Sequence, residues 1–544
     1  MVKGVSVMDD FTERRPYNAV SDFVDTHVAQ GRAGKPAFID PERTLTYGEL
    51  QTRSQRLAHG LRALGIRQED RVALLLPDTV DTPVAFWGTV RAGSVAIPLN
   101  TFLHAAQYAY ILADSRATAL IAAAPLAQAI WPVLAQLPHL ETVILTGAVD
   151  QANFPGSKVH SFEDVIAGAN DTPFTADTVS DEVAFWLYTS GSTGDPKGVK
   201  HVHTNLMATA RLFGQDVLGI REDDVVHSAA KLFFAYGLGN AMTFPLSVGA
   251  TSVLWPPRPT PDAVFEIMRH HQPSIFYAVP SLYTALLAHK DIGKGIGSDR
   301  LRVCVSAGEA LPAHIGKRWR DIVGVDVLDG IGSTELLQTF LSNRPGDIRY
   351  GSTGKPVPGY EARIVDETGR ELGADEIGEL IIRGPSAGEG YWNQRAKSRR
   401  TFAGEWTYTG DKFRRDADGY YYYCGRTDDM FKVSGMWVSP FDVEAALASH
   451  EAVLEAAVIG KQDADGLIKP KAFIVLKIGY TADESLLEKL KLHVKEHAGA
   501  WKYPRWIELR DDLPRTATGK IQRFKLREED LRAGGEPTTA FILA

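Results

Sequence analysis

Short apolar segments that alternate with helical segments constrain the fold of this 544-residue chain more than any other sequence feature. Each is a nearly continuous apolar run, which is the pattern of a strand buried on both faces of a sheet. The clearest are Val72–Leu76, Ser94–Pro98, Ser274–Val279, Leu301–Ser306 and Val325–Leu328. Because buried strands separated by helices form mostly parallel sheets flanked by helices, we predict an α/β fold.

Capping residues locate several helix boundaries. Thr46 and Glu49 have the spacing of a capping box, leucines follow at helical intervals, and Gly65 is a suitable C-terminal stop. Pro83–Arg91 reads as a further helix. The segment Ala117–Leu140 contains no Asp, Glu, Lys or Arg, but prolines interrupt it. We interpret this segment as a strand followed by a capped helix rather than as a membrane span.

The composition argues against several classes of protein. The 59 Lys and Arg residues against 67 Asp and Glu give a net charge of −8, which does not suit a nucleic-acid-binding or membrane-surface protein. Cys304 and Cys424 form no close-spaced motif, so we expect neither disulfides nor a zinc site. Residues 1–15 lack the apolar core of a signal peptide. These features fit a cytoplasmic protein, with Cys304 in its core.

A different pattern begins toward the C-terminus, where a compact α+β domain is expected. Ser439 and Pro440 mark a helix start, with Ser as the N-cap and Pro at the first helical position. Thr481 and Glu484 form a second capping-box pattern, and Lys471–Lys477 reads as a strand between the two helices. The predicted architecture is a large N-terminal domain of α/β subdomains with a smaller β unit, followed by a small mobile α+β domain.

The most informative segment is Tyr188–Gly198, which follows the strand candidate Val183–Leu187. It combines three glycines, four hydroxyl side chains and Lys197. Backbone N–H groups, hydroxyls and an ammonium arranged in this way can surround a phosphate. The spacing fits neither a P-loop nor a Rossmann loop, and protein-kinase motifs do not accompany it. A solvated turn is the alternative interpretation.

Together with four later segments, this loop resembles the acyl-adenylate-forming superfamily, which includes acyl-CoA synthetases, peptide-synthetase adenylation domains and firefly luciferases. The five motifs occur in the family order: Tyr188–Gly198, Asp329–Glu335, Tyr408–Asp411, Gly425–Gly435 and Pro514–Lys520. In the second motif, Ile331 stands where the family usually has Tyr. Five ordered motifs are far more specific than any one of them.

The resemblance implies a reaction in two steps. A carboxylate attacks the α-phosphate of ATP to form an acyl-adenylate and pyrophosphate, and a thiol, usually that of coenzyme A, then displaces AMP. Two anions meet in the first step, so positioning and charge neutralisation should dominate catalysis. The resemblance implies that Thr334 hydrogen-bonds the α-phosphate, that Glu335 holds Mg²⁺, and that Lys520 bridges the carboxylate and the α-phosphate.

The same resemblance implies the other nucleotide and coenzyme A contacts. They come from the phosphate loop, two adenine-binding segments, the ribose motif and the hinge motif. The residues are Thr189, Ser190, Gly191, Ser192, Thr193, Gly194, Lys197, Gly308, Glu309, Asp329, Gly330, Ile331, Gly332, Ser333, Asp411, Arg426 and Gly435. The structural alternatives are a helix-start role for Glu335 and a turn role for Asp411.

A hinge at Asp428 is also implied, between a large domain of residues 1–427 and a small domain of residues 428–544. Rotation about this hinge would present Lys520 for the first step. The other orientation would present Gly435, where a glycine lets the pantetheine arm of coenzyme A pass.

The acyl pocket is expected around Lys231–Gly239. No acidic residue lies between Lys231 and Pro245, which argues against an α-amino acid substrate. Aromatic side chains and glycines in the segment favour a flat ring. The segments Ala229–Gly239, Asp329–Glu335 and Leu341–Asn343 closely resemble benzoate- and hydroxybenzoate-CoA ligases. The implied pocket residues are Phe234, Ala235, Tyr236, Gly237, Ala307, Gln338, Thr339 and Lys432.

That subfamily usually has a His-Ile pair where Gln338 and Thr339 stand, so a ring hydroxyl or amino group is expected to be accommodated. The predicted protein is an acid–thiol ligase that uses ATP, Mg²⁺ and coenzyme A on benzoate or a hydroxy- or aminobenzoate. Two alternatives stay open: a stand-alone adenylating enzyme for another acid or acceptor, and a non-catalytic nucleotide-binding homologue. The expected partner is a small aromatic carboxylic acid, without nucleic acid or membrane, and a homodimer is a candidate assembly.

Replacing Lys520 by Ala separates the two half-reactions. The variant is expected to lose acyl-adenylate formation, because the charge that bridges the two anions is gone. It is expected to keep converting a supplied acyl-adenylate to the thioester, since that step uses the other orientation of the small domain. ATP–pyrophosphate exchange and thioester formation from synthetic acyl-adenylate measure the two steps. Equal loss of both would contradict the assignment.

Overall fold

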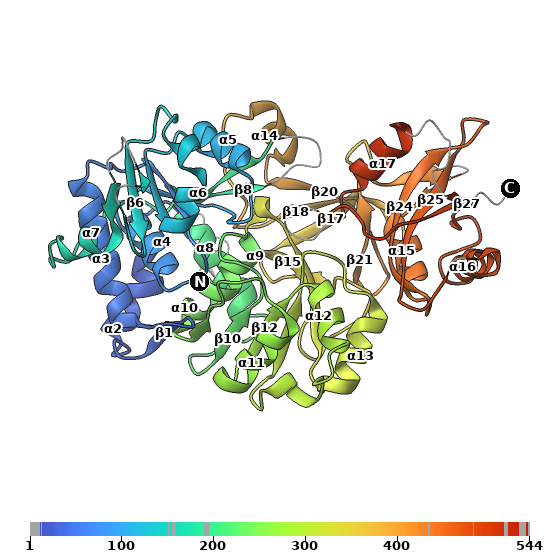
Figure 1. The fold of residues 1–544 in the computed structure, drawn as a ribbon, viewed down its shortest axis with the longest axis horizontal. Helices are drawn as coiled ribbons and strands as arrows, with labels where there is room; N and C mark the ends of the chain where they lie inside the picture. The colour runs from blue at the N-terminus through green and yellow to red at the C-terminus, as the bar shows by residue number, and fades with distance from the viewer. Residues whose placement is uncertain are drawn as a thin grey trace, which may run out of the picture. The chain divides into compact units, whose positions relative to one another are not determined.

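The computed structural model describes residues 11, 13–150, 153–154, 159–189, 195–433, 436–481, 483–515, 521–532 and 540–541. The chain forms two compact units (Figure 1). Unit 1 comprises residues 1–361 and 382–407, and unit 2 comprises residues 362–381 and 408–544. The predicted boundary between residues 427 and 428 is a hinge for domain rotation, and a division into compact units does not test it. The boundary stays a prediction.

Unit 1 contains a seven-stranded sheet in which every neighbouring pair is parallel except β8 and β9. In spatial order the strands are β7 (Val159–Ser161), β6 (Thr142–Thr146), β5 (Ala119–Ala123), β3 (Arg71–Leu75), β4 (Val95–Pro98), β8 (Val183–Thr189) and β9 (Lys197–Val202). The accompanying helices are α3 (Tyr47–Ala63), α4 (Asp81–Arg91), α5 (Ala105–Ser115), α6 (Ala124–Leu134) and α7 (Phe162–Ala167). One hydrophobic cluster joins α5 and α6 to the sheet and includes Trp131 and Trp186.

A nine-stranded sheet forms the other half of unit 1. Its order is β16 (Lys355–Pro356), β15 (Thr339–Ser342), β14 (Val327–Gly332), β13 (Val303–Ser306), β12 (Ile275–Ala278), β10 (Val225–Ser228), β11 (Thr251–Val253), β1 (Pro36–Ile39) and β2 (Thr44–Thr46). The six strands from β14 to β1 in this order are parallel. Side chains of α11, α12 and α13 pack on β12, β13 and β14 in one cluster (Figure 1).

The helices of this half are mostly short. They are η1 (Ser21–Asp25), α2 (Thr26–Ala29), α8 (His203–Thr209), η3 (Ala210–Gln215), α9 (Ala235–Leu238), η4 (Gly239–Thr243), α10 (Phe244–Val248), α11 (Pro261–His271), α12 (Pro280–Leu287), η5 (Lys294–Gly297), α13 (Ala313–Val323) and η6 (Thr334–Leu336). Of these, η1, η3 and η4 are π-helical and η5 and η6 are 3₁₀ turns. Short π-helical pieces are frequent near functional sites.

Unit 2 is built around a small mixed sheet. That sheet has the order β24 (Val453–Gln462), β25 (Ile468–Leu476), β26 (Trp506–Leu509) and β27 (Ala540–Phe541). Its helices are α15 (Pro440–Ala448), α16 (Glu484–His497) and α17 (Arg523–Arg532), and β22 (Phe431–Val433) and β23 (Met436–Val438) form a hairpin. The remaining elements of the chain are β17 (Glu361–Val365), β18 (Gly378–Arg383), α14 (Arg395–Thr401), β19 (Phe402–Ala403), β20 (Trp406–Arg415) and β21 (Tyr421–Arg426).

The architecture confirms the α/β prediction. All five apolar runs are strands, the Thr46–Glu49 capping box is present, and Ser439 accepts a hydrogen bond from the N–H of Asp442. The second capping box is wrong, because α16 begins at Glu484 with Asp483 as its N-cap. The segment 117–140 is a strand and a helix, as predicted, but its N-cap Ala123 makes no side-chain cap. Among the described residues no helix is long and apolar enough to cross a membrane.

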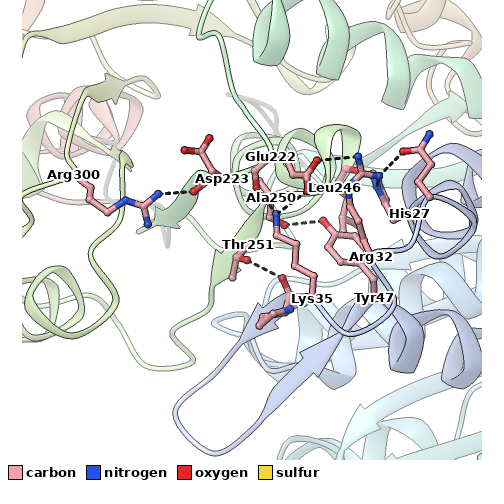
Figure 2. A network of polar contacts seen from close by, with 12 residues as sticks. His27, Arg32, Lys35, Tyr47, Glu222, Asp223, Leu246, Ala250, Thr251 and Arg300 are labelled. Carbon is pink, nitrogen blue, oxygen red and sulfur yellow. Dashed lines mark hydrogen bonds and ion pairs between the residues drawn. The ribbon is translucent and has the colours of Figure 1, made fainter.

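A network of polar contacts joins the N-terminal segment of unit 1 to the nine-stranded sheet and the helix beside it (Figure 2). The Tyr47 hydroxyl donates to the carbonyl of Ala250 at 2.7 Å, and Arg32 pairs with Glu222 at 2.9 Å. His27 Nε2 donates to the Leu246 carbonyl, and burial lowers the pKa of this histidine. Hydrogen bonds to backbone carbonyls, and not only apolar contacts, therefore join the two halves of unit 1.

Buried histidines make stability dependent on pH. His227 on β10 is fully buried, donates from Nδ1 to the Val253 carbonyl at 3.0 Å, and has its pKa lowered by burial to about 4. An unfolded histidine titrates near ~6.5. The unfolded chain therefore binds more protons below that pH, and stability is lost as the pH falls from ~6.5 toward ~4.

We expect His227→Asn to reduce this acid sensitivity. Between pH 7 and pH 5 the wild-type free energy of unfolding should fall by about 2 kcal/mol more than that of the variant. Urea unfolding of both proteins at the two pH values measures the difference, whatever the variant's stability at pH 7. Equal losses would show that His227 does not carry the effect.

Candidate functional site

The two ends of the phosphate-loop motif lie on neighbouring strands. Strands β8 and β9 pair antiparallel, with Thr189 opposite Lys197, and residues 190–194 lie outside the described residues. The predicted contacts of Ser190, Gly191, Ser192, Thr193 and Gly194 are therefore not described. Lys197 places its ammonium 4.3 Å from the ring centroid of Tyr391. Lys197 is the first residue of β9, and its contact with phosphate stays a prediction.

The turn η6 contains Thr334 and Glu335, and other segments hold its backbone. Every carbonyl of the turn accepts a hydrogen bond from a residue distant in sequence. The donors are His201 Nε2 to Thr334 at 2.8 Å, Gly388 N–H to Glu335 at 2.8 Å, and Ser386 Oγ to Leu336 at 2.7 Å. Three such bonds hold the backbone that carries Thr334 and Glu335.

His201 acts as a neutral donor in this arrangement. Its Nδ1 accepts from the Asn205 side chain at 3.0 Å, so the proton stays on Nε2, which faces Thr334. Burial lowers the pKa of His201 to about 4. Asn205 also donates to the carbonyls of Ser386 and Ala387. His201 lies on β9, and α8 begins two residues later at His203.

The Glu335 carboxylate accepts a hydrogen bond from the Tyr391 hydroxyl at 2.7 Å. It makes no cap on η6, so the helix-start alternative is not what the structure shows. No group of three or more His, Cys, Asp or Glu among the described residues could hold a metal ion by itself. A single carboxylate suits Mg²⁺, which takes its other oxygens from water and phosphates.

Of the two segments predicted to bind adenine, residues 307–309 follow β13 and residues 329–332 lie on β14. Asp329, paired in register with Ser306, is buried, and burial raises its pKa well above the usual range. Among the described residues, neither its Oδ1 nor the Ser306 hydroxyl has a hydrogen-bond partner. Ala307 is buried beside them, while Gly308 has φ +93° and is exposed and Glu309 is half-buried. A polar ligand edge would satisfy these two groups.

The glycines of the second motif have a packing role. A Cβ on Gly332 would lie 2.5 Å from the Gln338 carbonyl oxygen, and one on Gly330 would lie 3.0 Å from the Leu341 carbonyl oxygen. Leu341 lies on β15, the neighbouring antiparallel strand, and Gln338 directly precedes that strand. Ile331 lies between the two glycines, Ser333 follows them, and both are half-buried. The close approach of the neighbouring chain thus requires glycine at position 332 and leaves little room at position 330, independently of any bound base.

The acyl segment is fixed by Gln338. The Gln338 amide donates to the carbonyls of Tyr236 at 3.0 Å and Ala235 at 3.3 Å, and its oxygen accepts from the Thr339 N–H and hydroxyl, both at 2.9 Å. The Gln338 amide is therefore occupied by protein groups. The predicted contact of Gln338 and Thr339 with a ring substituent stays a prediction.

Two glycines of the acyl segment do not provide open space. A Cβ on Gly237 would lie 2.0 Å from the Lys231 carbonyl oxygen, and one on Gly239 would lie 2.2 Å from the Gln338 amide nitrogen. Both directions are filled by protein atoms, so close packing alone accounts for glycine at these two positions. The contact of this segment with a flat ring stays a prediction. Phe234 and Tyr236 remain half-buried. The Tyr236 hydroxyl donates to the Val305 carbonyl at 3.1 Å.

Sequence reasoning missed Asp78 beneath this segment. Both of its carboxylate oxygens face the Leu232 N–H, at 3.2 and 3.3 Å. Burial raises the pKa of Asp78 to about 6 despite the nearby Lys231. Lys231 in turn donates to the carbonyls of Trp255 and Pro257. The pattern offered no signal for Asp78, because its partner lies 154 residues away.

Unit 2 carries the ribose and hinge motifs. Asp411 on β20 lies opposite Arg426 on β21, and their side chains pair at 3.1 Å. Asp411 therefore belongs to a strand, and the turn alternative is wrong.

Asp428 is exposed, and Lys432 is exposed with its ammonium 4.6 Å from the Trp437 ring. Gly435 and Lys520 lie outside the described residues.

A half-buried ion-pair group follows the predicted hinge. Asp429 pairs with Arg527 at 2.8 Å and with Arg523 at 3.6 Å, and Arg523 also binds Glu444 at 2.6 Å. Arg523 and Arg527 lie on α17, which begins three residues after Lys520. Arginine forks that hold two carboxylates give a rigid junction. The chain just after the hinge is thereby tied to the helix that follows the predicted catalytic lysine.

Known proteins similar to this chain share the order of these elements. Residues 25–392 match the AMP-binding enzyme family, and residues 442–520 match the AMP-binding enzyme C-terminal domain. The 4-hydroxybenzoate–CoA/benzoate–CoA ligase of Rhodopseudomonas palustris is 54% identical over 95% of this chain and 95% of its own. The benzoate–CoA ligase of Thauera aromatica is 52% identical over 94% and 96%.

Two solved structures have the same fold over nearly the whole chain. An anthranilate CoA ligase in complex with anthranoyl-AMP is 43% identical, with a TM-score of 0.88 over 96% of this chain and 98% of its own. A benzoate CoA ligase from Burkholderia xenovorans LB400 is 48% identical, with a TM-score of 0.86 over 94% and 100%.

Removing the Gln338 amide should loosen the acyl segment. Gln338→Met keeps the length of the side chain but removes one donor from the Ala235 and Tyr236 carbonyls, which also accept from the Gly239 N–H, so we expect a loss of about 1 kcal/mol in unfolding free energy. Thr339→Val is the matched control, because the Thr339 N–H still satisfies the Gln338 oxygen, and it should cost less. Chemical denaturation measures both. Equal costs would contradict a bracing role for Gln338.

Proposed function

Because this chain belongs to the AMP-binding enzyme family, we propose that it is an aryl-acid CoA ligase, which joins benzoate or a hydroxy- or aminobenzoate to coenzyme A with ATP. The observation that carries the proposal is that relatives more than half identical over nearly their full length bear the names of benzoate- and hydroxybenzoate-CoA ligases. We place the reaction in the cytoplasm, where ATP and coenzyme A are available. A homodimer stays a prediction.

In the first step, an oxygen of the aryl carboxylate bonds to the α-phosphorus of ATP. The bond from that phosphorus to the β-bridging oxygen breaks, and pyrophosphate leaves with the electron pair. We assign the α-phosphate to the Thr334 hydroxyl, the β- and γ-phosphates to the loop ending at Lys197, and the two meeting anions to Lys520. Fixed donors aimed at developing charge suit this step, because water need not reorganise.

The magnesium ion is assigned to Glu335. When bound, it supplies positive charge between the phosphate oxygens. The side chain fits this role because its backbone carbonyl is held by the Gly388 N–H and its carboxylate by the Tyr391 hydroxyl. The carboxylate is thus oriented before any ion arrives. Asp411 and Arg426 are assigned to the ribose.

In the second step, the thiolate of coenzyme A attacks the acyl carbon, and the bond from that carbon to the AMP phosphate oxygen breaks. The products are the aryl thioester and AMP. We assign Gly435 to the pantetheine arm and Asp428 to the hinge between the steps. The ion-pair group of Asp429, Arg523 and Glu444 supports this, because it makes the chain after the hinge rigid.

The acyl segment supports an uncharged ring. No acidic residue lies between Lys231 and Pro245, and the hydroxyl of Tyr236 is already paired with a backbone carbonyl. Asp78 is buried and faces the Leu232 N–H instead of a substrate. A charged amine on the acid would find no counter-charge in this segment, and burying it unpaired is costly. Aromatic acids without a charged substituent are therefore the favoured class.

A panel of acids tests the proposal. ATP–pyrophosphate exchange is measured with benzoate, 4-hydroxybenzoate, 2-aminobenzoate, cinnamate and a fatty acid, followed by thioester formation with coenzyme A. We expect the three benzoates to exceed the fatty acid by at least about a hundredfold in kcat/KM, because the segment offers an aromatic pocket.

A variant controls for contaminating activity. Glu335→Gln keeps the shape of the side chain and removes its charge, and exchange should fall at least about a hundredfold, as when an electrostatic group is lost. No exchange with any aryl acid would refute the aryl proposal. Exchange without thioester formation would favour the stand-alone adenylating alternative, and absence of ATP binding would refute both.

A further inference from the structure

One buried aromatic residue touches both of the charged groups assigned to the triphosphate. The Tyr391 hydroxyl donates to Glu335 Oε1 at 2.7 Å, and the Lys197 ammonium lies 4.3 Å from the centroid of the same ring. Tyr391 is 6% exposed. A hydrogen bond to a carboxylate and a cation over a ring face are both stronger when water is excluded. The two groups of opposite charge are thus ordered by a single side chain.

The backbone of Tyr391 is itself held in place. Its segment runs beside β9 and pairs with it, so that the side chain cannot shift along the strand. The bonds are Glu389 N–H to Lys200 O at 2.9 Å, Lys200 N–H to Gly390 O at 3.2 Å, and Trp392 N–H to Gly198 O at 2.8 Å. Gly388 is required here, because a Cβ would lie 2.7 Å from Val199 Cγ1.

Two further contacts of Tyr391 are longer. Its hydroxyl lies 3.4 Å from the Thr401 hydroxyl, and its ring meets Phe402 edge-on with centroids 5.5 Å apart. Phe402 packing accounts for burial of the ring but not for a short bond from the hydroxyl to a carboxylate. That bond uses one of the two oxygens of the Glu335 carboxylate. A tyrosine that served only to fill space in the core would not need a hydrogen bond from its hydroxyl to the Glu335 carboxylate.

We propose that Tyr391 is a positioning residue for the adenylation step: its hydroxyl aims the Glu335 carboxylate at the metal ion, and its ring face holds the Lys197 ammonium beside the phosphate loop. This inference rests on the proposed function of the site. The hydroxyl and the ring have separable roles, so Tyr391→Phe removes the first and Tyr391→Leu removes both.

The test measures binding as well as turnover. Calorimetry gives the affinity for ATP without an acid substrate, in EDTA and in excess Mg²⁺. Tyr391→Phe should keep the EDTA affinity within about twofold, lose most of the gain that Mg²⁺ gives the wild type, and need about tenfold more Mg²⁺ for half-maximal exchange, the scale of a charge-assisted bond. Tyr391→Leu should also weaken ATP binding in EDTA, because Lys197 loses its ring.

Tyr47→Phe is the matched control. It removes a buried hydroxyl that donates to a carbonyl in the other half of unit 1, and its Mg²⁺ dependence should equal that of the wild type. Thermal unfolding of each variant shows how much fold stability is lost. The double variant Tyr391→Phe/Glu335→Gln completes a double-mutant cycle. In the Glu335→Gln background, Tyr391→Phe should no longer change the affinity for ATP in the presence of Mg²⁺.

The outcomes are distinguishable. A wild-type protein that binds no ATP refutes the proposed function. An active wild type with a Tyr391→Phe variant of unchanged Mg²⁺ dependence refutes the inference alone. A phenylalanine effect that persists in the Glu335→Gln background also refutes it, because the hydroxyl would then act through another group.

Discussion

The candidate site in unit 1 depends on one constraint, the backbone hydrogen bonding of residues 388–392 with β9. This pairing brings the Gly388 N–H to the Glu335 carbonyl and Tyr391 to the Glu335 carboxylate. His201, on the same strand β9, holds the neighbouring Thr334 carbonyl. Three chain segments separated by more than fifty residues thus meet on one three-residue turn. Such non-local bonds are costly in loop entropy, and they are the reason why the turn has one orientation.

Local patterns predicted the framework well, because the residues that determine it are neighbours in sequence. The Thr46–Glu49 capping box and the Ser439 N-cap depend on bonds spanning three residues, and both are present. The failure at Thr481 has a local cause as well. Asp483 is the stronger N-cap residue and lies directly before Glu484, so the helix starts there.

The candidate site was predicted only where a motif contained it. Glu335 and Asp411 belong to motifs, whereas Tyr391, Asp78 and His201 act through partners 56, 154 and 133 residues away. Nothing in their own neighbourhoods marks them, since a buried tyrosine or histidine is ordinarily a core residue.

The Gln338 brace has a consequence for how such a pocket can diverge. The amide supports the Ala235 and Tyr236 carbonyls and occupies the space beside Gly239. A side chain at position 239 would clash with the Gln338 amide, and loss of that amide would remove a donor from both carbonyls. Changes at positions 239 and 338 are therefore coupled, and single-site libraries would undersample them. Epistasis of this kind would keep the segment conserved as a block, even while the acid it accepts changes.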